Sequence, residues 1–159
     1  MANSADPSRQ ESWEKWWKEY GELKNRLNVY HDKLMGKYDR SGRDAAAWND
    51  VENVLERLYY FWSAAIVNAG DIFGYMEFMI ENKSGLEAIG AKGCLAAIDK
   101  LMPYYQEQLK LETDSQKNDY WHRTKLEREP AEGLAEDVNE FARLLLEYAE
   151  KNANRIGTD

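Results

Sequence analysis

The spacing of the apolar residues constrains the fold of this chain more than any other feature. From about Ser12 to Tyr38, large apolar side chains recur at steps of three and four residues, which is the period of one face of an α-helix. No segment shows the two-residue alternation that is typical of a half-buried strand. The stripe consists of Trp13, Trp16, Trp17, Tyr20, Leu23, Leu27, Tyr30 and Leu34. The pattern predicts an all-α fold with a Trp-rich N-terminal helix.

Similar patterns predict the rest of the bundle. A polar loop is expected over residues 112–119, and Pro103 is expected to kink or divide the helix that contains it. Pro130 suits the first turn of the last helix, whose buried stripe is expected to be Leu134, Val138, Phe141, Leu145 and Tyr148. Helices are predicted over residues 44–68, 71–81, 84–93, 94–111, 120–129 and from 130 onward. We expect about six to seven helices in one domain, residues 1–159.

The composition favours a folded protein in a reducing compartment. Of 159 residues, 43% are hydrophobic and 13% are aromatic, which is too apolar for a disordered chain. The one cysteine, Cys94, excludes an internal disulfide framework. The N-terminus lacks the apolar region of a signal peptide, and the longest apolar stretch, Leu58–Val67, is too short to span a bilayer. We therefore expect a cytoplasmic protein.

The charge points to basic partners. The chain has 29 acidic and 21 basic residues, a formal net charge of −8. Residues 71–159 hold 18 acidic and 11 basic residues, so most of the excess lies in the second half. Such a chain repels nucleic acids and anionic membranes. We expect no direct nucleic-acid binding and no membrane binding, but a protein partner that is basic or binds DNA.

The residues that could support catalysis or metal binding are few. His31 lies beside Asp32, as a base oriented by a carboxylate would, but it has no other expected partner. His122 follows Asp119 by three residues, which gives only one of the paired motifs of a di-metal bundle. Cys94 lies among small apolar residues, which favours a buried structural thiol. We predict no catalytic residue, no metal ligand and no cofactor.

Two features of the surface have competing interpretations. The tryptophans of the first helix, with Lys15 and Lys18, are compatible with membrane-surface binding, but the interspersed glutamates favour a core or subunit contact. The acidic residues of the last third are either a solvated face or a row of carboxylates that stand in for phosphates. The candidates for partner binding are Glu127, Glu129, Glu132, Glu136, Asp137, Glu140, Glu147 and Glu150.

Two motifs in the middle of the chain point to a known family. The first is "IVNAGDIFGYMEF", with Val67, Asn68, Gly70, Phe73, Tyr75 and Phe78; the second is "SGLEAIGAKG", with Leu86, Ile89, Gly90 and Ala91. Through these motifs and "VNEFARLLLEYAEKN", the chain resembles a bacterial DNA-mimic protein family that is also known as a domain of unknown function. The match covers about residues 50–155, and the N-terminal helix, residues 1–43, lies outside it.

The resemblance implies a non-enzymatic, all-helical protein, a homodimer, and acidic residues that occupy the DNA site of a DNA-binding protein. It also implies structural roles for its motif residues, with Asn68 and Gly70 at a buried corner between helices. An immunity or antitoxin protein that caps a toxin or nuclease is the alternative, since it shares the acidity. A metal protein or enzyme that uses His122 and Asp119 is a third hypothesis.

Overall fold

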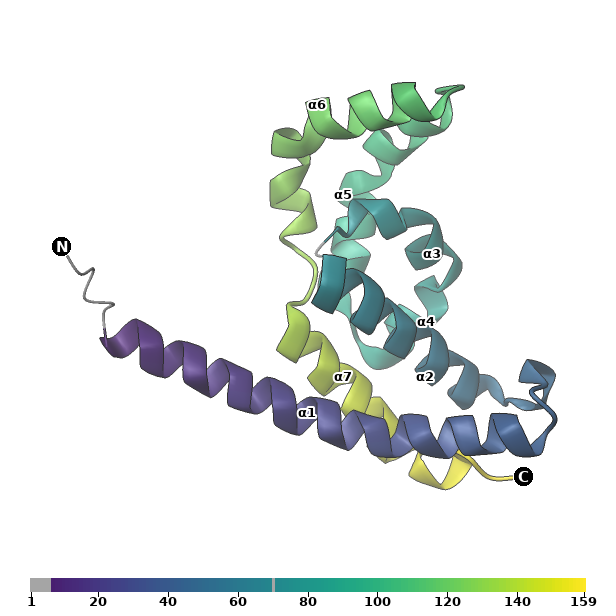
Figure 1. Ribbon diagram of the computed structural model, residues 1–159. Helices are drawn as coiled ribbons and strands as arrows, with labels where there is room; N and C mark the ends of the chain where they lie inside the picture. Colours follow the sequence, from purple (N-terminus) through teal and green to yellow (C-terminus); the bar gives the residue numbers. More distant parts are fainter. Residues whose placement is uncertain (1–6, 70) are drawn as a thin grey trace. The chain divides into compact units, whose positions relative to one another are not determined.

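The computed structural model describes residues 7–69 and 71–159. Over these residues the chain forms seven α-helices and no β-strand (Figure 1). They are α1 (Pro7–Arg40), α2 (Asp50–Phe61), α3 (Met76–Glu81), α4 (Lys83–Ile89), α5 (Lys92–Leu109), α6 (Asp114–Glu132) and α7 (Val138–Lys151). Three short 3₁₀ turns (Ala45–Ala47, Phe73–Tyr75 and Ala153–Arg155) and a π-helical segment (Trp62–Ala69) accompany them. The predicted all-α class, the number of helices and the Trp-rich first helix are confirmed.

The described chain divides into two compact units. The terminal unit contains the residues up to Glu56 together with Val138–Asp159, and the central unit is Arg57–Asp137. No helix in the described part of the chain combines the length and the apolarity that crossing a bilayer requires. The single domain expected from the length of the chain stays a prediction.

The terminal unit is built on the contact between α1 and α7, which lie side by side in Figure 1. Leu27 and Leu34 of α1, with Phe141 and Leu145 of α7, are fully buried. These four positions belong to the predicted apolar stripes, so the helical period identified this part of the core. At 1.5 Å per residue, α1 is about 51 Å long and α7 about 21 Å. α7 therefore covers only part of α1.

The N-terminal tryptophans are not core residues. Trp13 is 59% exposed and Trp17 is 48% exposed. α7 begins beside Trp16, where the Nδ2 of Asn139 donates to the Trp16 carbonyl oxygen at 3.2 Å, so the first turns of α1 extend beyond α7. The rings contact one another instead, with Trp16 stacked between Trp13 and Tyr20. The core interpretation is wrong for Trp13 and Trp17, and a subunit contact stays a prediction.

A buried ion pair joins the end of α1 to the start of α2. The Nζ of Lys37 lies 2.7 Å from the Oε1 of Glu52, and both side chains are buried. The same carboxylate accepts from the backbone N–H groups of Asn49 and Gly157, each at 3.0 Å. Burial alone raises the pKa of Glu52, but the hydrogen bonds from Lys37, Asn49 and Gly157 outweigh it and lower the pKa.

In the central unit, α5 is not divided at Pro103. The helix continues to Leu109, with Pro103 inside it and exposed. Cys94, Ala97, Ile98 and Leu101 form its buried face, so the helix is anchored in the core before the proline. Loss of one backbone hydrogen bond does not end a helix that is anchored in this way.

The predicted boundaries around α6 are wrong. α6 begins at Asp114 because Thr113 and Gln116 form a reciprocal capping box, with the Thr113 hydroxyl accepting from the Gln116 N–H. Most of the stretch expected to be a loop is therefore helix. Pro130 lies in the last turn of α6, not in the first turn of the last helix. Leu134 consequently falls in the connection before α7 and is 45% exposed, not buried.

The motif residues of the family resemblance divide between the surface and the core. The expectation that Asn68 lies at a buried corner is wrong, because its side chain is exposed. The Nδ2 of Asn68 donates to the carbonyl oxygen of Ser63 at 2.6 Å, which satisfies a backbone group in the π-helical segment. Phe73 is 2% exposed. Gly90 ends α4 in the left-handed conformation, with φ of 76°, which glycine adopts without strain. Gly70 lies outside the described residues.

Candidate functional site

The eight carboxylates expected to bind a partner divide between the two units. Glu140, Glu147 and Glu150 lie on α7 in the terminal unit. The other five belong to the end of α6 and to the connection after it, in the central unit: Glu127, Glu129, Glu132, Glu136 and Asp137. The structure thus gives two acidic groups, each with its own surroundings.

The α6 group contains carboxylates with different roles. Glu127 and Glu129 are exposed, and neither forms an ion pair with a residue that the structure describes. Glu132 is half-buried and pairs with the guanidinium of Arg128. Burial raises the pKa of Glu132, Arg128 opposes this rise, and the nearby carboxylate of Asp71 adds to it. Glu127 and Glu129 are therefore the members that remain available to a partner.

Glu136 does not lie on the acidic surface. It is 7% exposed, and its carboxylate accepts from the backbone N–H groups of Gly93 at 2.6 Å and Cys94 at 2.8 Å. These N–H groups belong to the first turn of α5, where Ala91 at the N-cap has no side-chain acceptor. A carboxylate there also complements the positive end of the helix dipole. The expectation that Glu136 binds a partner is corrected: its carboxylate caps α5.

Position 93 must be glycine because the contact leaves no room for a side chain. A Cβ on Gly93 would overlap the carbonyl oxygen of Leu134 and crowd the carboxylate of Glu136. The sequence did contain a sign of this contact, since no Ser, Thr, Asp or Asn precedes "KGC". A helix that begins without such a capping residue needs an acceptor from elsewhere in the chain for its first N–H groups. This sign predicts a need for an acceptor but does not identify Glu136.

The α7 group is interrupted by positive charge. Glu150 pairs with Arg26 of α1, and Arg143, between Glu140 and Glu147 on α7, donates to Glu19 at 2.9 Å. Glu147 is exposed and forms no ion pair with a described residue. The face of α7 expected to be acidic therefore carries both signs of charge where it meets α1.

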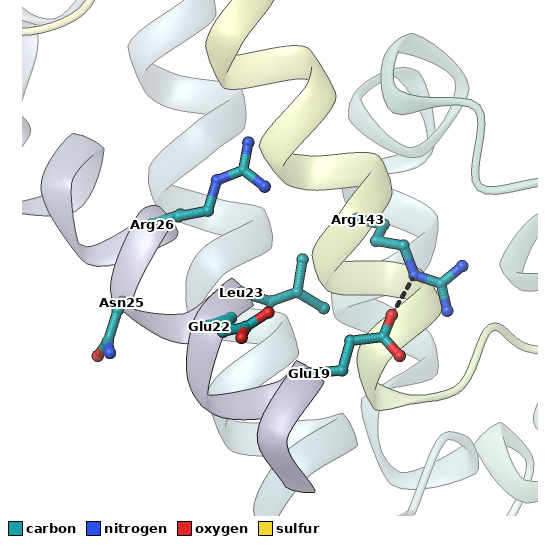
Figure 2. Close-up of a pocket in the computed structure, with 6 residues that line it drawn as sticks. All are labelled: Glu19, Glu22, Leu23, Asn25, Arg26 and Arg143. Atoms are coloured by element: carbon teal, nitrogen blue, oxygen red, sulfur yellow. Dashed lines mark ion pairs between the residues drawn. The ribbon is translucent and has the colours of Figure 1, made fainter. Parts of the chain in front are cut away.

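A pocket of about 530 Å³ lies along this contact. Figure 2 shows its lining, with the ion pair between Glu19 and Arg143 on one side and Arg26 on the other. Leu23, which is 6% exposed, is its apolar member, and Glu22 and Asn25 complete it. Both arginines already have carboxylate partners, so this pocket is not a free anion site. Its mixed charges suit a polar protein surface.

A second pocket, in the central unit, was missed by the sequence analysis. It has a volume of about 330 Å³. Its lining combines aromatic rings with the carboxylates of Glu77 and Glu81: Tyr60, Gly74, Tyr75, Glu77, Phe78 and Glu81. The signal available in the sequence was the pair of acids one helical turn apart among aromatic residues, in "YMEFMIE".

The histidines lie in ordinary surroundings. His31 is half-buried, and burial lowers its pKa, while Asp32 and Glu56 oppose the shift. His122 is exposed and contacts the ring of Trp121. Among residues 7–69 and 71–159, no three His, Cys, Asp or Glu side chains lie close enough together to hold a metal ion. Cys94 is buried, as expected.

Comparisons with family models, with curated proteins and with solved structures give no match to this chain.

Proposed function

We propose that this protein is a non-enzymatic, acidic interaction protein whose exposed carboxylates occupy the DNA-binding surface of a protein partner. The observation that carries the proposal is that each unit by itself has exposed glutamates without a cationic partner among the described residues: Glu127 and Glu129 in the central unit and Glu147 in the terminal unit. Carboxylates of this kind offer the acceptors that an arginine or lysine otherwise finds on phosphate.

The charge of the central unit supports the same proposal. It contains 14 acidic and 9 basic residues. Several of the bases are engaged within the unit, because Arg128 pairs with Glu132 and Lys110 pairs with Glu107. The remaining negative field attracts a basic surface and speeds its encounter with the protein.

The test uses the full chain as bait. The protein is immobilised, lysate of its native host is passed over it, and bound proteins are released by salt from about 0.1 M to about 1 M, over which the Debye length falls from about 10 Å to about 3 Å. The captured partner is then purified and offered duplex DNA in competition. A DNA-binding protein that is displaced by duplex DNA supports the proposal. A partner that binds DNA and this protein at the same time contradicts it.

A pair of matched variants separates the named glutamates from net charge. The test variant is Glu127→Gln/Glu129→Gln/Glu147→Gln. The control removes three exposed acids from elsewhere, Glu11→Gln/Glu87→Gln/Glu112→Gln, and so has the same net charge. The proposal requires the test variant to lose affinity for the partner by at least about tenfold relative to the control.

The alternative is an immunity or antitoxin protein that caps a toxin or nuclease. The observation that favours it is the mixed charge of the pocket between α1 and α7, where Glu19, Arg26 and Arg143 offer both signs to a partner. Interleaved charges of both signs suit one specific partner more than a phosphate-binding surface in general. One small partner, held through high salt and indifferent to DNA, supports this alternative.

A further inference from the structure

The pocket in the central unit has an aromatic frame. Tyr60 is 50% exposed, and its ring lies 5.7 Å from that of Phe78. Behind them, the buried ring of Phe61 stacks on Phe78 at 5.8 Å and meets the edge of Tyr75 at 6.3 Å. The rings of Tyr60 and Phe78 are therefore held by α2 and α3, and part of their surface remains open to solvent.

Gly74 leaves one wall of the pocket without a side chain. Its N–H donates to the Oδ1 of Asp71 at 3.0 Å, and a Cβ at this position would overlap the Asp71 carboxylate. No side chain can therefore extend from position 74 into the pocket without displacing that turn.

Two carboxylates complete the lining. Glu77 and Glu81 lie one turn apart on α3, both exposed. Neither forms an ion pair in the described parts of the chain. Arg57, one turn before Tyr60 on α2, donates instead to the Oδ1 of Asn82 at 3.3 Å. The pocket thus has negative charge without an internal counter-charge.

The carboxylates of Glu77 and Glu81 also act on Tyr105. Burial raises the pKa of Tyr105, and the carboxylates of Glu77 and Glu81 raise it further. The phenol therefore stays protonated at neutral pH and adds no negative charge. Glu77 and Glu81 are the anionic side chains among the residues that line the pocket.

Elsewhere in this protein, an arginine already lies between an aromatic ring and a carboxylate. In the same unit, the guanidinium of Arg128 lies over the ring of Phe73, 4.1 Å from its centroid, and pairs with Glu132. The pocket at Tyr60 offers the same two kinds of partner, an aromatic face and a carboxylate, without the arginine. A planar guanidinium can stack on the ring and donate two parallel hydrogen bonds to a carboxylate, whereas an ammonium cannot.

We infer that this pocket, lined by Tyr60, Tyr75, Glu77, Phe78 and Glu81, binds an arginine side chain of a protein partner. A volume of about 330 Å³ lies at the small end of the range of about 300–1,000 Å³ for ligand pockets, which suits one side chain. The inference rests on the proposed function for the source of the arginine, a basic surface that otherwise contacts phosphate.

The test is an NMR titration of the full chain labelled with ¹⁵N. The probe is the blocked peptide acetyl-Gly-Arg-Gly-amide, and its analogues carry citrulline or lysine in place of arginine. Citrulline has the shape of arginine without its charge. We expect saturable shifts at the amides of residues 74–81, with binding of the citrulline peptide weaker by about tenfold or more.

The variant pair is Glu77→Gln/Glu81→Gln against Glu87→Gln/Asp99→Asn. Both pairs remove two exposed acids from the central unit, so they change its net charge equally. The first pair should weaken binding of the arginine peptide by about tenfold or more, and the second by less than about threefold. Tyr60→Leu, which keeps apolar area but removes the ring, should weaken it by at least about twofold.

Three results would overturn the inference: equal losses in the two variant pairs, shifts that do not saturate, or a lysine peptide that binds as tightly as the arginine peptide. This titration and the test of the proposed function can fail independently of each other. A partner displaced by DNA, together with no arginine binding at residues 74–81, overturns the pocket alone. Saturable arginine binding together with a partner indifferent to DNA overturns the proposed function alone.

Discussion

The Nζ of Lys37 lies 2.7 Å from the Oε1 of Glu52, and both side chains are buried. The pair joins the last turn of α1 to the first turn of α2, and the carboxylate also holds the N–H of Gly157 near the C-terminus. One buried group therefore ties three separated segments of the terminal unit together.

Removing the lysine should be costly. Lys37→Met leaves the Glu52 carboxylate buried without its cation, which typically costs about 3–5 kcal/mol of the free energy of unfolding. Urea unfolding, followed by circular dichroism, measures the loss. The double variant Lys37→Met/Glu52→Leu removes both charges and should recover part of it. A single variant as stable as the wild type would show that the pair does not hold this junction.

The same carboxylate makes stability depend on acid pH. Its pKa is lowered in the folded protein from an ordinary value of 4.5, so the unfolded chain binds its proton more readily. The stabilisation is therefore fully present above about pH 4.5 and is lost as the pH falls through the lowered pKa. The difference in stability between the wild type and Glu52→Gln should shrink as the pH falls below about 4.5. A difference that is constant with pH would contradict the assignment.

Two glycine substitutions should act in opposite directions. Gly93→Ala forces a Cβ against the carbonyl oxygen of Leu134 and the Glu136 carboxylate, and should destabilise the protein by about 1–3 kcal/mol. Gly21→Ala adds a methyl group inside α1, where no atom beyond the adjoining helix backbone lies within 4 Å, and should stabilise the protein by about 0.5–1 kcal/mol. Thermal unfolding compares them, and a stabilising Gly93→Ala would refute the cap on α5.

Arg128 should not be replaceable by lysine. Its guanidinium stacks on Phe73, and its Nη2 and Nε donate to the Trp121 carbonyl oxygen at 2.7 Å and to the Thr124 hydroxyl at 3.0 Å. An ammonium cannot reproduce this planar set of donors. We expect Arg128→Lys to cost about 1.5–3 kcal/mol, because lysine keeps the charge but loses hydrogen bonds that the charged guanidinium donates. Chemical denaturation measures it, with Arg123→Lys, at an exposed position on the same helix, as the control.

The helical period predicted much of the fold. Leu27, Leu34, Phe141 and Leu145 were placed on apolar stripes and are fully buried. Such positions are set by local geometry, because residues three and four apart share one face of a helix whatever lies opposite. The capping box at Thr113 was equally local, and its Thr-x-x-Gln signature was present in the sequence but not used.

The predictions were wrong where contacts between distant parts of the chain determine the structure. Pro130 has a local preference for a first turn, but it lies in the last turn of α6, two residues after Arg128, whose guanidinium stacks on the distant Phe73. Glu136 looked like part of an acidic row, but it lies in a connection and bonds to the start of α5, more than forty residues earlier. Periodicity applies only within a helix, so it could not predict either outcome.

The pocket at Tyr60 was missed for a similar reason. Tyr75 and Phe78 were assigned structural roles from the family resemblance, and they do contact the buried Phe61. Their open surfaces become apparent only when α2 places Tyr60 beside them. The acids expected to bind a partner were sought in the last third of the chain, so Glu77 and Glu81 were not considered.

The most direct test of the proposed function is the competition between duplex DNA and this protein for the captured partner. The affinity of the partner for the protein is measured at rising concentrations of duplex DNA, with the wild type, Glu127→Gln/Glu129→Gln/Glu147→Gln and the charge-matched control. The proposal predicts mutually exclusive binding that weakens with salt, and a loss of at least about tenfold confined to the first variant. A ternary complex with DNA, or equal losses in the two variants, would contradict it.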